Sequence, residues 1–513
     1  MIVIYHDHHK VVKIDALTNE ILSFNKKGTI SSVLIETAIK YPESKIVWCD
    51  QKFEKLLDLD SLNNAFHHDK MMLSYDPNTF GFFGNEIGYV DESVFIKVNK
   101  EVTYPTWQMS STVGTIHAKS LLMIKDKIKQ DHNFDYYLSS IAKLCMPLGL
   151  LCYSEPSLLK KHSTIEKTGA NRFVLFRFVK QHYRTRWVFL LFLNLFLYEK
   201  RLALLPLIFC FLYNRRKIKK DVLENIAVQS NKKVLDTGTI DVIIPTIGRK
   251  EYLFNVLKDL SVQTQLPKKV IIVEQNPNPE STSELDYLTN NEWPFVIKHI
   301  FTHQAGACNA RNLALAEVES EWVFLNDDDN EFNADLIKET LSNCVKYGTA
   351  VASNSYLTSN DIKTMNHIHQ ASFFGSGNSF VLSKLLEKVS FRMGFEFGYG
   401  EDSDFGMQLR NAGFDVLYFP HPEILHLKAP IGGFRTKPEL LWNQDLVKPK
   451  PSPTISLFKL LHETKEQHLG YKTILFIKAY RRQPVKNPFK YFFKFQREWK
   501  KSIYWANQLI DRS

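Results

Sequence analysis

The sequence has little that would suit disulfide bonds or a zinc site. Its six cysteines are scattered, with no CxxC pair and no histidine at a spacing that suits zinc (Cys49, Cys145, Cys152, Cys210, Cys308 and Cys344). This pattern argues for a reducing compartment. The first residues, Met1 to Asp7, also lack the basic and apolar regions of a secretory signal, so we expect a cytoplasmic protein.

Long apolar runs are scarce as well. Residues 187–213 are almost wholly aliphatic and aromatic, but Glu199, Lys200 and Arg201 interrupt them. Each half is shorter than the roughly 20 residues that cross a bilayer. Basic residues flank the run at Arg184, Arg186, Arg215, Arg216, Lys217, Lys219 and Lys220. Two interpretations stay open, a helical hairpin on an anionic membrane surface or helix packing between domains.

Composition sets the size and charge of the protein. With 513 residues, 44% hydrophobic and 23% charged, the chain is ordinary in composition and too long for one core, so we expect two or more domains. Its net charge of +10 favours anionic neighbours such as lipid, phosphorylated carriers or nucleic acid. We expect peripheral attachment to the cytoplasmic face of a membrane and no nucleic acid partner.

Strands and helices are expected to alternate from Thr239 to Arg435. A short apolar run from Asp241 to Pro245 precedes a segment of helical periodicity, and further buried strands are indicated at Val270–Val273 and Trp322–Leu325. This order predicts an α/β fold with a mainly parallel sheet flanked by helices. Ligands bind beyond the carboxyl ends of such strands, so the polar residues there are candidate site residues.

The last of these strands leads into three adjacent carboxylates, Asp327 to Asp329. Adjacent carboxylates repel one another, and a divalent cation at the end of the strand would offset the repulsion. A calcium loop of the EF-hand type needs glycine and glutamate where Phe332 and Lys338 stand, which excludes that kind of site. A solvated acidic turn is the alternative.

A second acidic group, Glu401, Asp402 and Asp404, opens a helix. Acidic residues in a first turn often only complement the helix dipole. Two acidic clusters in one domain of this topology favour a division of labour, in which one set holds a metal and the other supplies a general base.

Several short motifs follow one another in this region. They are Pro245 at the end of the first strand, Gly306-Ala-Cys-Asn-Ala-Arg-Asn312, the Asp327–Asp329 cluster, Gly375-Ser-Gly-Asn-Ser379 and Gly400-Glu-Asp-Ser-Asp-Phe-Gly406. In this order they resemble the family 2 glycosyltransferases of the GT-A fold. The resemblance covers about 200 of the 513 residues, and its specificity lies in the order of the motifs rather than in any one of them.

The resemblance implies a role for each matching residue. Asp327 and Asp329 would bind a divalent metal, Mn²⁺ or Mg²⁺, and Asp402 would be the base that activates the acceptor hydroxyl, supported by Glu401 and Asp404. A downstream histidine often completes the metal shell in relatives. His426 is the best match, with His421 as the alternative and a purely structural histidine as the other interpretation.

The resemblance also implies a set of donor-binding residues: Pro245, Thr246, Glu274, Arg311, Asp328 and Arg435. Glu274 stands where the family usually has an aspartate, which leaves the base of the nucleotide open. Arg435, in the Gly432-Gly-Phe-Arg435 segment, would reach the donor diphosphate from a mobile loop, although a plain loop is an equal alternative. The expected reaction is a single displacement with inversion, from a nucleotide diphosphate sugar to a glycan or lipid-linked acceptor.

The N-terminal region contains echoes of the second half. Glu43 to Asp50 echoes Glu319 to Asp327, and Gly149 to Leu159 echoes Gly413 to Leu425. We therefore predict a duplicated GT-A fold in which the first copy is degenerate, because Gln51 and Lys52 follow Asp50, and Asp135-Tyr-Tyr137 replaces the Glu-Asp motif. An unrelated α/β domain with chance similarity is the alternative.

Four segments follow from these observations. They are a degenerate GT-A-like domain without catalytic motifs at 1–165, a basic and apolar helical linker at 166–235, the catalytic domain at 236–435, and a proline-containing connector with a basic aromatic helical tail at 436–513. The predicted function is that of a metal-dependent glycosyltransferase in surface polysaccharide or related glycan synthesis. A nucleotidyltransferase is disfavoured by the single glycine in Pro245–Lys250, and a non-catalytic nucleotide-sugar or glycan-binding protein by the presence of a base.

Overall fold

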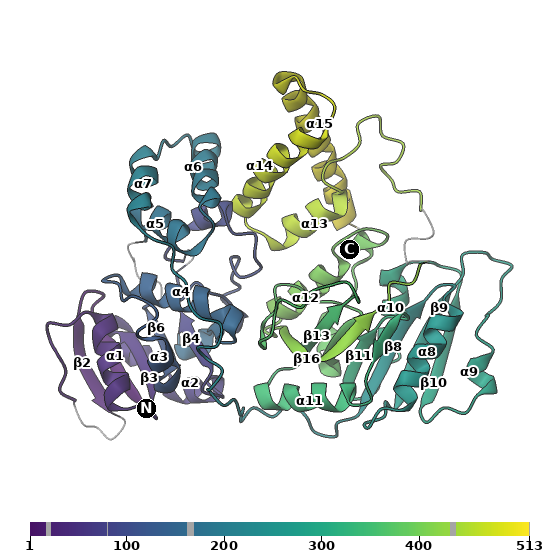
Figure 1. The fold of residues 1–513 in the computed structure, drawn as a ribbon, viewed down its shortest axis with the longest axis horizontal. Coiled ribbons are helices and arrows are strands. Elements are labelled where there is room, and N and C mark those ends of the chain that lie inside the picture. The colour runs from purple at the N-terminus through teal and green to yellow at the C-terminus, as the bar shows by residue number, and fades with distance from the viewer. Residues whose placement is uncertain (17–21, 79–80, 162–168, 431–437, 512–513) are drawn as a thin grey trace. The chain divides into compact units, whose positions relative to one another are not determined.

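The computed structural model describes residues 1–16, 22–78, 81–161, 169–430 and 438–511. The chain forms two compact units. The first contains Met1–Lys232 and Glu463–Ala479, and the second contains Lys233–His462 and Tyr480–Ser513 (Figure 1). The predicted linker at 166–235 thus lies almost wholly in the first unit, and the predicted tail is divided between both.

The first unit is built on a seven-stranded sheet in the order β2-β1-β3-β6-β4-β7-β5. The strands are β1 (Ile2–His6), β2 (Val11–Ala16), β3 (Lys45–Asp50), β4 (Met71–Tyr75), β5 (Tyr104–Pro105), β6 (Val113–His117) and β7 (Leu151–Ser154). The helices that connect them are α1 (Ile30–Lys40), α2 (Leu59–Ala65), α3 (Ala118–Ile124) and α4 (Phe134–Cys145). Trp48 and Ile116 of the sheet and Leu34 and Tyr137 of the helices are fully buried in a common core.

Three further helices of this unit group together beyond α4, away from β1, β2 and β3 (Figure 1). They are α5 (Arg172–His182), α6 (Arg186–Glu199) and α7 (Leu204–Phe209). The first part of α14 (Lys465–Arg482) joins them, since Thr473 Oγ1 donates to Asn194 Oδ1 of α6 at 2.7 Å. No helix of the described ranges has the length and apolar content needed to cross a membrane.

The second unit is built on a nine-stranded sheet in the order β10-β9-β8-β11-β15-β13-β16-β12, with β14 paired to β16. The strands are β8 (Ile240–Thr246), β9 (Lys269–Gln275), β10 (Val296–Thr302), β11 (Trp322–Asn326), β12 (Asn330–Phe332), β13 (Val351–Leu357), β14 (His369–Gln370), β15 (Asn378–Leu382) and β16 (Leu417–His426). The predicted α/β class is confirmed. The sheet is mixed, because β15 runs antiparallel to both of its neighbours, β11 and β13.

Helices flank this sheet and continue into the C-terminal region. They are α8 (Lys250–Ser261), α9 (Tyr287–Asn290), α10 (Ala307–Leu315), α11 (Leu336–Tyr347), α12 (Glu401–Asn411), α13 (Pro453–His462) and α15 (Pro488–Ile510). On α8, the helical spacing predicted from the sequence puts Leu253, Val256, Leu257 and Leu260 in the core. On α15, Tyr491 and Phe495 are buried while Phe489 and Phe493 are exposed.

The two sheets share one topology. In the first, β1-β3-β6-β4-β7 pair in the sequence parallel, antiparallel, antiparallel, parallel. In the second, β8-β11-β15-β13-β16 pair in the same sequence. The short strands β5 and β14 each add antiparallel to the last member of their series. The duplication predicted from sequence echoes is therefore visible in strand order and direction.

The two copies differ at one edge. Next to β8 the second unit carries two parallel strands, β9 and β10, whereas next to β1 the first unit carries the antiparallel strand β2. In a sheet of this kind the carboxyl ends of parallel strands hold the ligand. Among its described strands, the first unit therefore has no counterpart of β9 and β10, whose carboxyl ends would form one half of such a site.

Candidate active site

A cleft of about 330 Å³ lies at the carboxyl ends of β8, β9 and β11 in the second unit. The N-terminal ends of helices α10 and α12 also reach it. The residues that line it and were predicted from the sequence are Pro245, Thr246, Arg311, Asp327, Asp328, Asp329, Glu401, Asp402 and His426. The fold therefore brings together two acidic clusters that lie more than seventy residues apart in the chain.

Asp327 lies opposite Arg311 of helix α10. Arg311 Nη2 is 3.1 Å from Asp327 Oδ1, and the phenol of Tyr356 donates to Oδ2 at 3.1 Å. Burial disfavours the charged guanidinium, but Asp327, Asp402 and the neighbouring Glu401 raise the pKa of Arg311 above its ordinary value. A Cβ atom at Gly377 would come within 2.1 Å of Asp327 Oδ2, so any larger residue there would displace this carboxylate.

Asp328 is almost completely buried and has other partners than Asp327. Thr246 Oγ1 donates to its Oδ2 at 2.7 Å, and Arg249 Nη1 forms an ion pair with its Oδ1. Burial raises the pKa of Asp328 to about 6, against the influence of Arg249 and Thr246. Asp328 therefore ties the end of β8 to the end of β11.

Asp329 adjoins His426, the last residue of β16. The distance from His426 Nε2 to Asp329 Oδ1 is 3.5 Å, and the imidazole stacks on Tyr356 at 4.6 Å between ring centroids. Burial opposes ionisation, yet hydrogen bonds from His426 and from the amide of Ala429, together with Arg249, lower the pKa of Asp329. The alternative histidine, His421, is mostly exposed and lies beside Glu423 and Lys363 instead.

Asp327, Asp329 and His426 are the candidate ligands for a divalent metal. Within the described part of the chain, no three His, Cys, Asp or Glu side chains converge as they stand to hold an ion. The donor set nevertheless suits Mn²⁺ or Mg²⁺, because carboxylate oxygens and one imidazole line the same cleft and Asp329 already faces His426. At present Arg249 and Arg311 supply the positive charge beside the carboxylates.

Asp402 lies in the first turn of α12, and Ser376 Oγ donates a short hydrogen bond to its Oδ1. Burial raises the pKa of Asp402, while Arg311 and Ser376 act in the opposite direction. A second pocket of about 470 Å³, lined by residues of the β13–β15 region, adjoins the cleft. Asp327 and Asp402 line both spaces, so the Asp402 carboxylate stands at their boundary.

The two acidic residues beside Asp402 have different surroundings. Glu401 lines the cleft, and burial and the neighbouring Asp402 raise the pKa of its carboxyl group. Asp404 is fully buried on the other side of the helix, where Arg392 Nη1 and His462 Nε2 lie 2.9 and 2.7 Å from its Oδ1. Asp404 thus joins α12 to α13 and does not face the cleft.

Two predicted donor-binding residues remain. Glu274, at the end of β9, accepts hydrogen bonds from His299, Ser283 and the amide of Glu284, and these lower its pKa although burial opposes them. Its neighbour Gln275 lines the cleft. Arg435 and the Gly432–Arg435 loop lie outside the described residues.

Three residues of the site were not predicted from the sequence. Arg249 reaches both Asp328 and Asp329, Tyr356 contacts Asp327, and the carboxylate of Glu396 accepts hydrogen bonds from the amides of Cys308 and Asn309 at the start of α10. Arg249 could have been predicted, since it follows the first strand of the domain closely and therefore lies at the edge of the sheet where ligands bind. Tyr356 and Glu396 lie on distant segments that only the fold brings to the cleft.

Comparison with known proteins agrees with this arrangement. Residues 241–404 match the family model described as glycosyl transferase family 2. This part of the chain is a family 2 glycosyltransferase domain. An uncharacterised glycosyltransferase of Rickettsia conorii is 26% identical over 171 residues, which are 33% of this chain and 27% of that protein. The chain therefore spans about a quarter of this curated relative.

Two solved structures are also similar. TarS of S. aureus, residues 1–349 in complex with UDP-GlcNAc, has 18% identity and a TM-score of 0.35, covering 53% of this chain and 81% of that one. GalNAc-T7 with UDP, GalNAc and Mn²⁺ has 13% identity and a TM-score of 0.31, covering 37% of this chain and 44% of that one.

The first unit repeats one contact of the family 2 domain. Asp135 is the second residue of α4, as Asp402 is of α12, and Ser111, two residues before β6, donates its amide and hydroxyl to the two Asp135 oxygens at 2.8 and 2.9 Å. Ser376 is likewise two residues before β15. The sequence motif Asp135-Tyr-Tyr137 therefore preserves the position of the aspartate but not of the glutamate.

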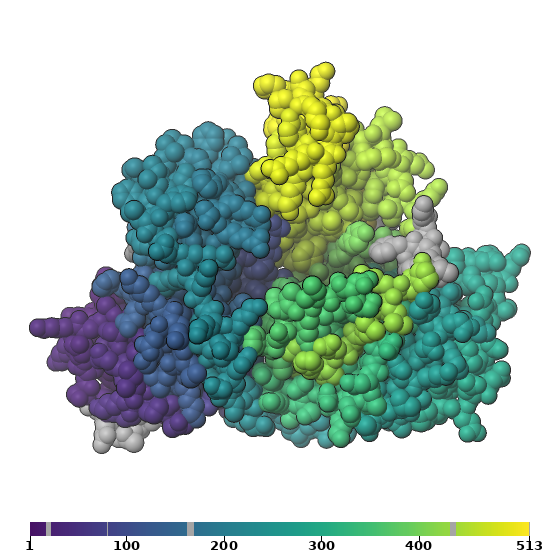
Figure 2. Space-filling view, in the orientation of Figure 1, coloured from purple at the N-terminus to yellow at the C-terminus, as the bar shows by residue number. Residues whose placement is uncertain are grey.

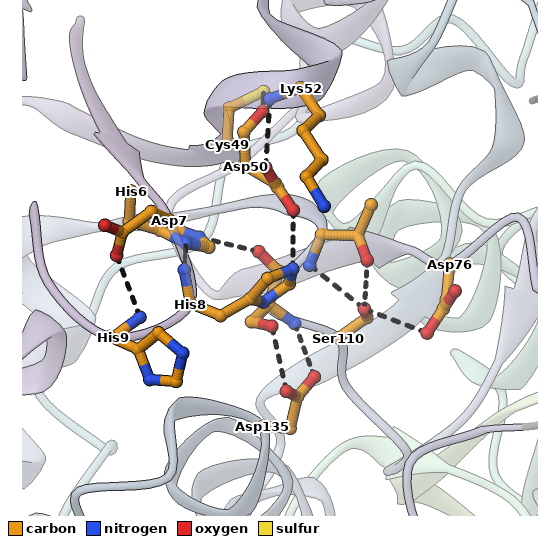
Figure 3. Close-up of polar contacts among 12 residues, drawn as sticks. His6, Asp7, His8, His9, Cys49, Asp50, Lys52, Asp76, Ser110 and Asp135 are labelled. Atoms are coloured by element: carbon orange, nitrogen blue, oxygen red, sulfur yellow. Dashed lines mark hydrogen bonds and ion pairs between the residues drawn. The ribbon is translucent and has the colours of Figure 1, made fainter. Parts of the chain in front are cut away.

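The region that corresponds to the Asp327–Asp329 cluster differs more. At the end of β3, Asp50 Oδ2 pairs with His8 Nε2 at 2.5 Å, while His6 hydrogen-bonds the backbone of Ser111 (Figure 3). Burial lowers the pKa of His6 to about 4, so this ring is neutral near pH 7. His6 at the end of β1 and His8 just after it thus lie between Asp50 and Asp135. In the family 2 domain an open cleft lies between Asp327 and Asp402.

Proposed function

We propose that the family 2 domain transfers a sugar from a nucleotide diphosphate donor to a hydroxyl group of a glycan or lipid-linked acceptor, with inversion at the anomeric carbon. One observation carries the proposal: Asp402 lies at the boundary between the charged cleft and the neighbouring pocket. A base placed there has access to a donor on one side and to an acceptor on the other.

The cleft is the donor side. Arg249 and Arg311 lie beside its carboxylates and offer positive charge to a diphosphate. Pro245 and Thr246 end β8 at this edge, where nucleotides bind in parallel sheets. Asp328 fixes Thr246 and Arg249 in place. Glu274 is proposed to act in nucleotide recognition through the loop that it holds.

The neighbouring pocket is the acceptor side. It combines apolar side chains such as Met365 and Phe373 with the polar groups of Asn354 and Tyr356. Sugar rings present both apolar faces and hydroxyl edges, so this mixed lining suits a glycan. A surface polysaccharide or related glycan is the acceptor class that we propose.

The reaction needs few protein groups. The acceptor hydroxyl oxygen attacks the anomeric carbon, its proton passes to the Asp402 carboxylate, and the bond between that carbon and the diphosphate oxygen breaks. The bonding pair departs with the nucleoside diphosphate. Asp327, Asp329 and His426 would hold a divalent metal, which when bound supplies positive charge to the leaving diphosphate. A single displacement of this kind inverts the configuration.

A panel of UDP-, GDP- and dTDP-sugars tests the proposal with the purified full chain. We expect one donor to be hydrolysed or transferred in the presence of Mn²⁺ or Mg²⁺, and the activity to disappear in Asp402→Asn. Binding of the donor without any turnover, in parent and variant alike, would contradict the enzymatic role and point to a binding protein.

A further inference from the structure

The helices α5, α6 and α7 carry an unusual number of exposed apolar side chains. Leu212 is 76% exposed, Ile208 63% and Leu205 62%, and Phe189, Phe196 and Phe209 are each about half exposed. Single exposed hydrophobic residues are normal on protein surfaces, whereas a contiguous group marks an interaction site. We call this group, on α6, α7 and the turn Cys210–Leu212, the hairpin face.

The exposed side chains occupy one side of each helix. On α6, Phe189, Phe196 and Leu197 point outward, while Val188, Leu191 and Leu195 are fully buried. On α7, Leu204, Leu205, Ile208 and Phe209 are exposed, and Pro206 faces inward. A ring contact between Phe189 and Phe211, at 5.8 Å between centroids, joins the two parts. The hairpin face is therefore continuous, and the inner sides already provide the packing that holds the helices in place.

The hairpin face is edged by positive charge. Between residues 184 and 220 the chain has nine lysines and arginines and one acidic residue, Glu199. Eight of the nine basic side chains are exposed (Arg184, Arg186, Lys200, Arg201, Arg215, Lys217, Lys219 and Lys220). Arg184 precedes α6 and Arg186 begins it, Lys200 and Arg201 lie between α6 and α7, and the other four follow the turn Cys210–Leu212. An apolar face with a cationic edge is complementary to a layer of apolar chains beneath anionic headgroups.

The dimensions of the helices also match the interface of a bilayer. The 14 residues of α6 extend about 21 Å and the 6 residues of α7 about 9 Å, less than the roughly 30 Å of a hydrocarbon core. Helices that lie in the interface insert their apolar side chains by only about 5–10 Å.

We propose that the hairpin face binds the surface of a membrane that contains anionic lipids. The proposal does not depend on the catalytic function of the family 2 domain. Membrane binding would hold the enzyme where lipid-linked or membrane-proximal acceptors are present. It also makes the apolar residues 187–213 a binding surface in addition to a packing element.

Vesicle flotation with the full chain tests the proposal. We expect the parent protein to float with phosphatidylcholine vesicles that contain phosphatidylglycerol, and to bind at least about tenfold more weakly to pure phosphatidylcholine or in high salt. The double variant Leu205→Ser/Ile208→Ser should lose at least about tenfold in affinity for the anionic vesicles. Replacing Lys217, Lys219 and Lys220 by alanine should weaken binding to anionic vesicles only.

A matched control uses two exposed apolar residues of the second unit, Val262 and Leu446, which are 64% and 104% exposed. Val262→Ser/Leu446→Ser should bind vesicles like the parent. All of these positions are on the surface, so folding is retained and circular dichroism should be unchanged. The proposal is overturned if the parent does not float, or if the hairpin variant floats as the parent does. A loss of flotation in Phe489→Ser/Phe493→Ser alone would assign the contact to α15 and also overturn it.

Discussion

Asp402 and Asp329 share one cleft but have different neighbours. Asp402 accepts a hydrogen bond from Ser376 and borders the second pocket. Asp329 adjoins His426 and the Arg249 guanidinium, and its backbone carbonyl accepts the amide of Leu427. The first environment suits a group that takes up a proton, and the second suits a group that binds cations.

Substitutions at these positions should therefore differ in kind. Asp402→Asn keeps the shape but cannot accept the proton, so turnover should fall by about two to four orders of magnitude while donor binding survives. Asp329→Ala should weaken the affinity for metal and donor together with turnover. Calorimetry with the active nucleotide sugar and Mn²⁺ separates the two. Normal turnover in Asp402→Asn, or parental donor and metal affinity in Asp329→Ala, would refute the assignment.

The pH dependence of turnover should report Asp402. The base acts when deprotonated, so the rate falls as the pH drops through its pKa. Burial raises this pKa above that of an ordinary aspartate, about 3.9, and the Ser376 hydrogen bond opposes the rise. Ser376→Ala should therefore move the acidic limb of the kcat profile to higher pH. Ser353→Ala should leave the acidic limb in place, because the Ser353 hydroxyl contacts Ser379 and not Asp402. Equal limbs in both variants would contradict this role.

The sequence predicts the site residues that stand in motifs. Asp327, Asp329, Asp402 and Arg311 all line the cleft. Asp327 and Asp329 closely follow β11, Asp402 lies in the first turn of α12, and Arg311 lies one turn into α10. Glu396 could not be predicted, since its carboxylate reaches α10 only through tertiary structure.

Among the elements, α13 has a direct bearing on the site. It packs beside α12, where His462 reaches the buried Asp404, and Thr454 Oγ1 accepts the amide of Tyr399 just before α12 begins. Gly398 is required for this approach, because a side chain there would come within 2.3 Å of Thr454. The helix that carries Asp402 is thus held by a segment beyond residue 435, the end of the predicted catalytic domain.

Removing His462 should loosen this attachment. His462→Ala leaves the buried carboxylate of Asp404 with one hydrogen-bond partner fewer, which we expect to cost about 1–3 kcal/mol of unfolding free energy. Lys494→Ala is the control, because its pair with Glu498 on the surface of α15 should contribute less than about 0.5 kcal/mol. Urea unfolding followed by tryptophan fluorescence measures both. Equal midpoints for the two variants would show that the contact is not stabilising.

Hydrophobic periodicity predicts where strands and helices lie better than it predicts which strands pair. The strands at 241–245, 270–273 and 322–325 are predicted because three or four apolar residues stand together in each of them. The antiparallel position of β15 between β11 and β13 could not be predicted. Apolar runs indicate that a strand is buried on both faces, but they do not show in which direction the strand runs. The two-residue strands β5 and β14 are too short to leave any pattern.

For the whole molecule, the duplicated topology leads to a test of which copy is active. Asp135 and Asp402 occupy matching positions, but only Asp402 borders an open cleft with clustered carboxylates. In the full chain, Asp135→Asn should retain parental turnover, whereas Asp402→Asn should abolish it. Loss of turnover in Asp135→Asn, with unchanged thermal unfolding, would mean that the first unit takes part in catalysis.

The path of the chain through α14 has one more consequence. After completing most of the second unit, the chain returns to the first for Glu463–Ala479, where Gln467 Nε2 donates to the backbone of Asp91 and Thr473 bonds Asn194. The architecture is nested rather than tandem. A stop codon after His462 would remove α14 from the first unit. Cleavage near residue 232 would separate the first unit from α14, so that the N-terminal fragment would not contain a complete unit by itself. Neither unit can therefore be expressed or exchanged alone without disrupting the other.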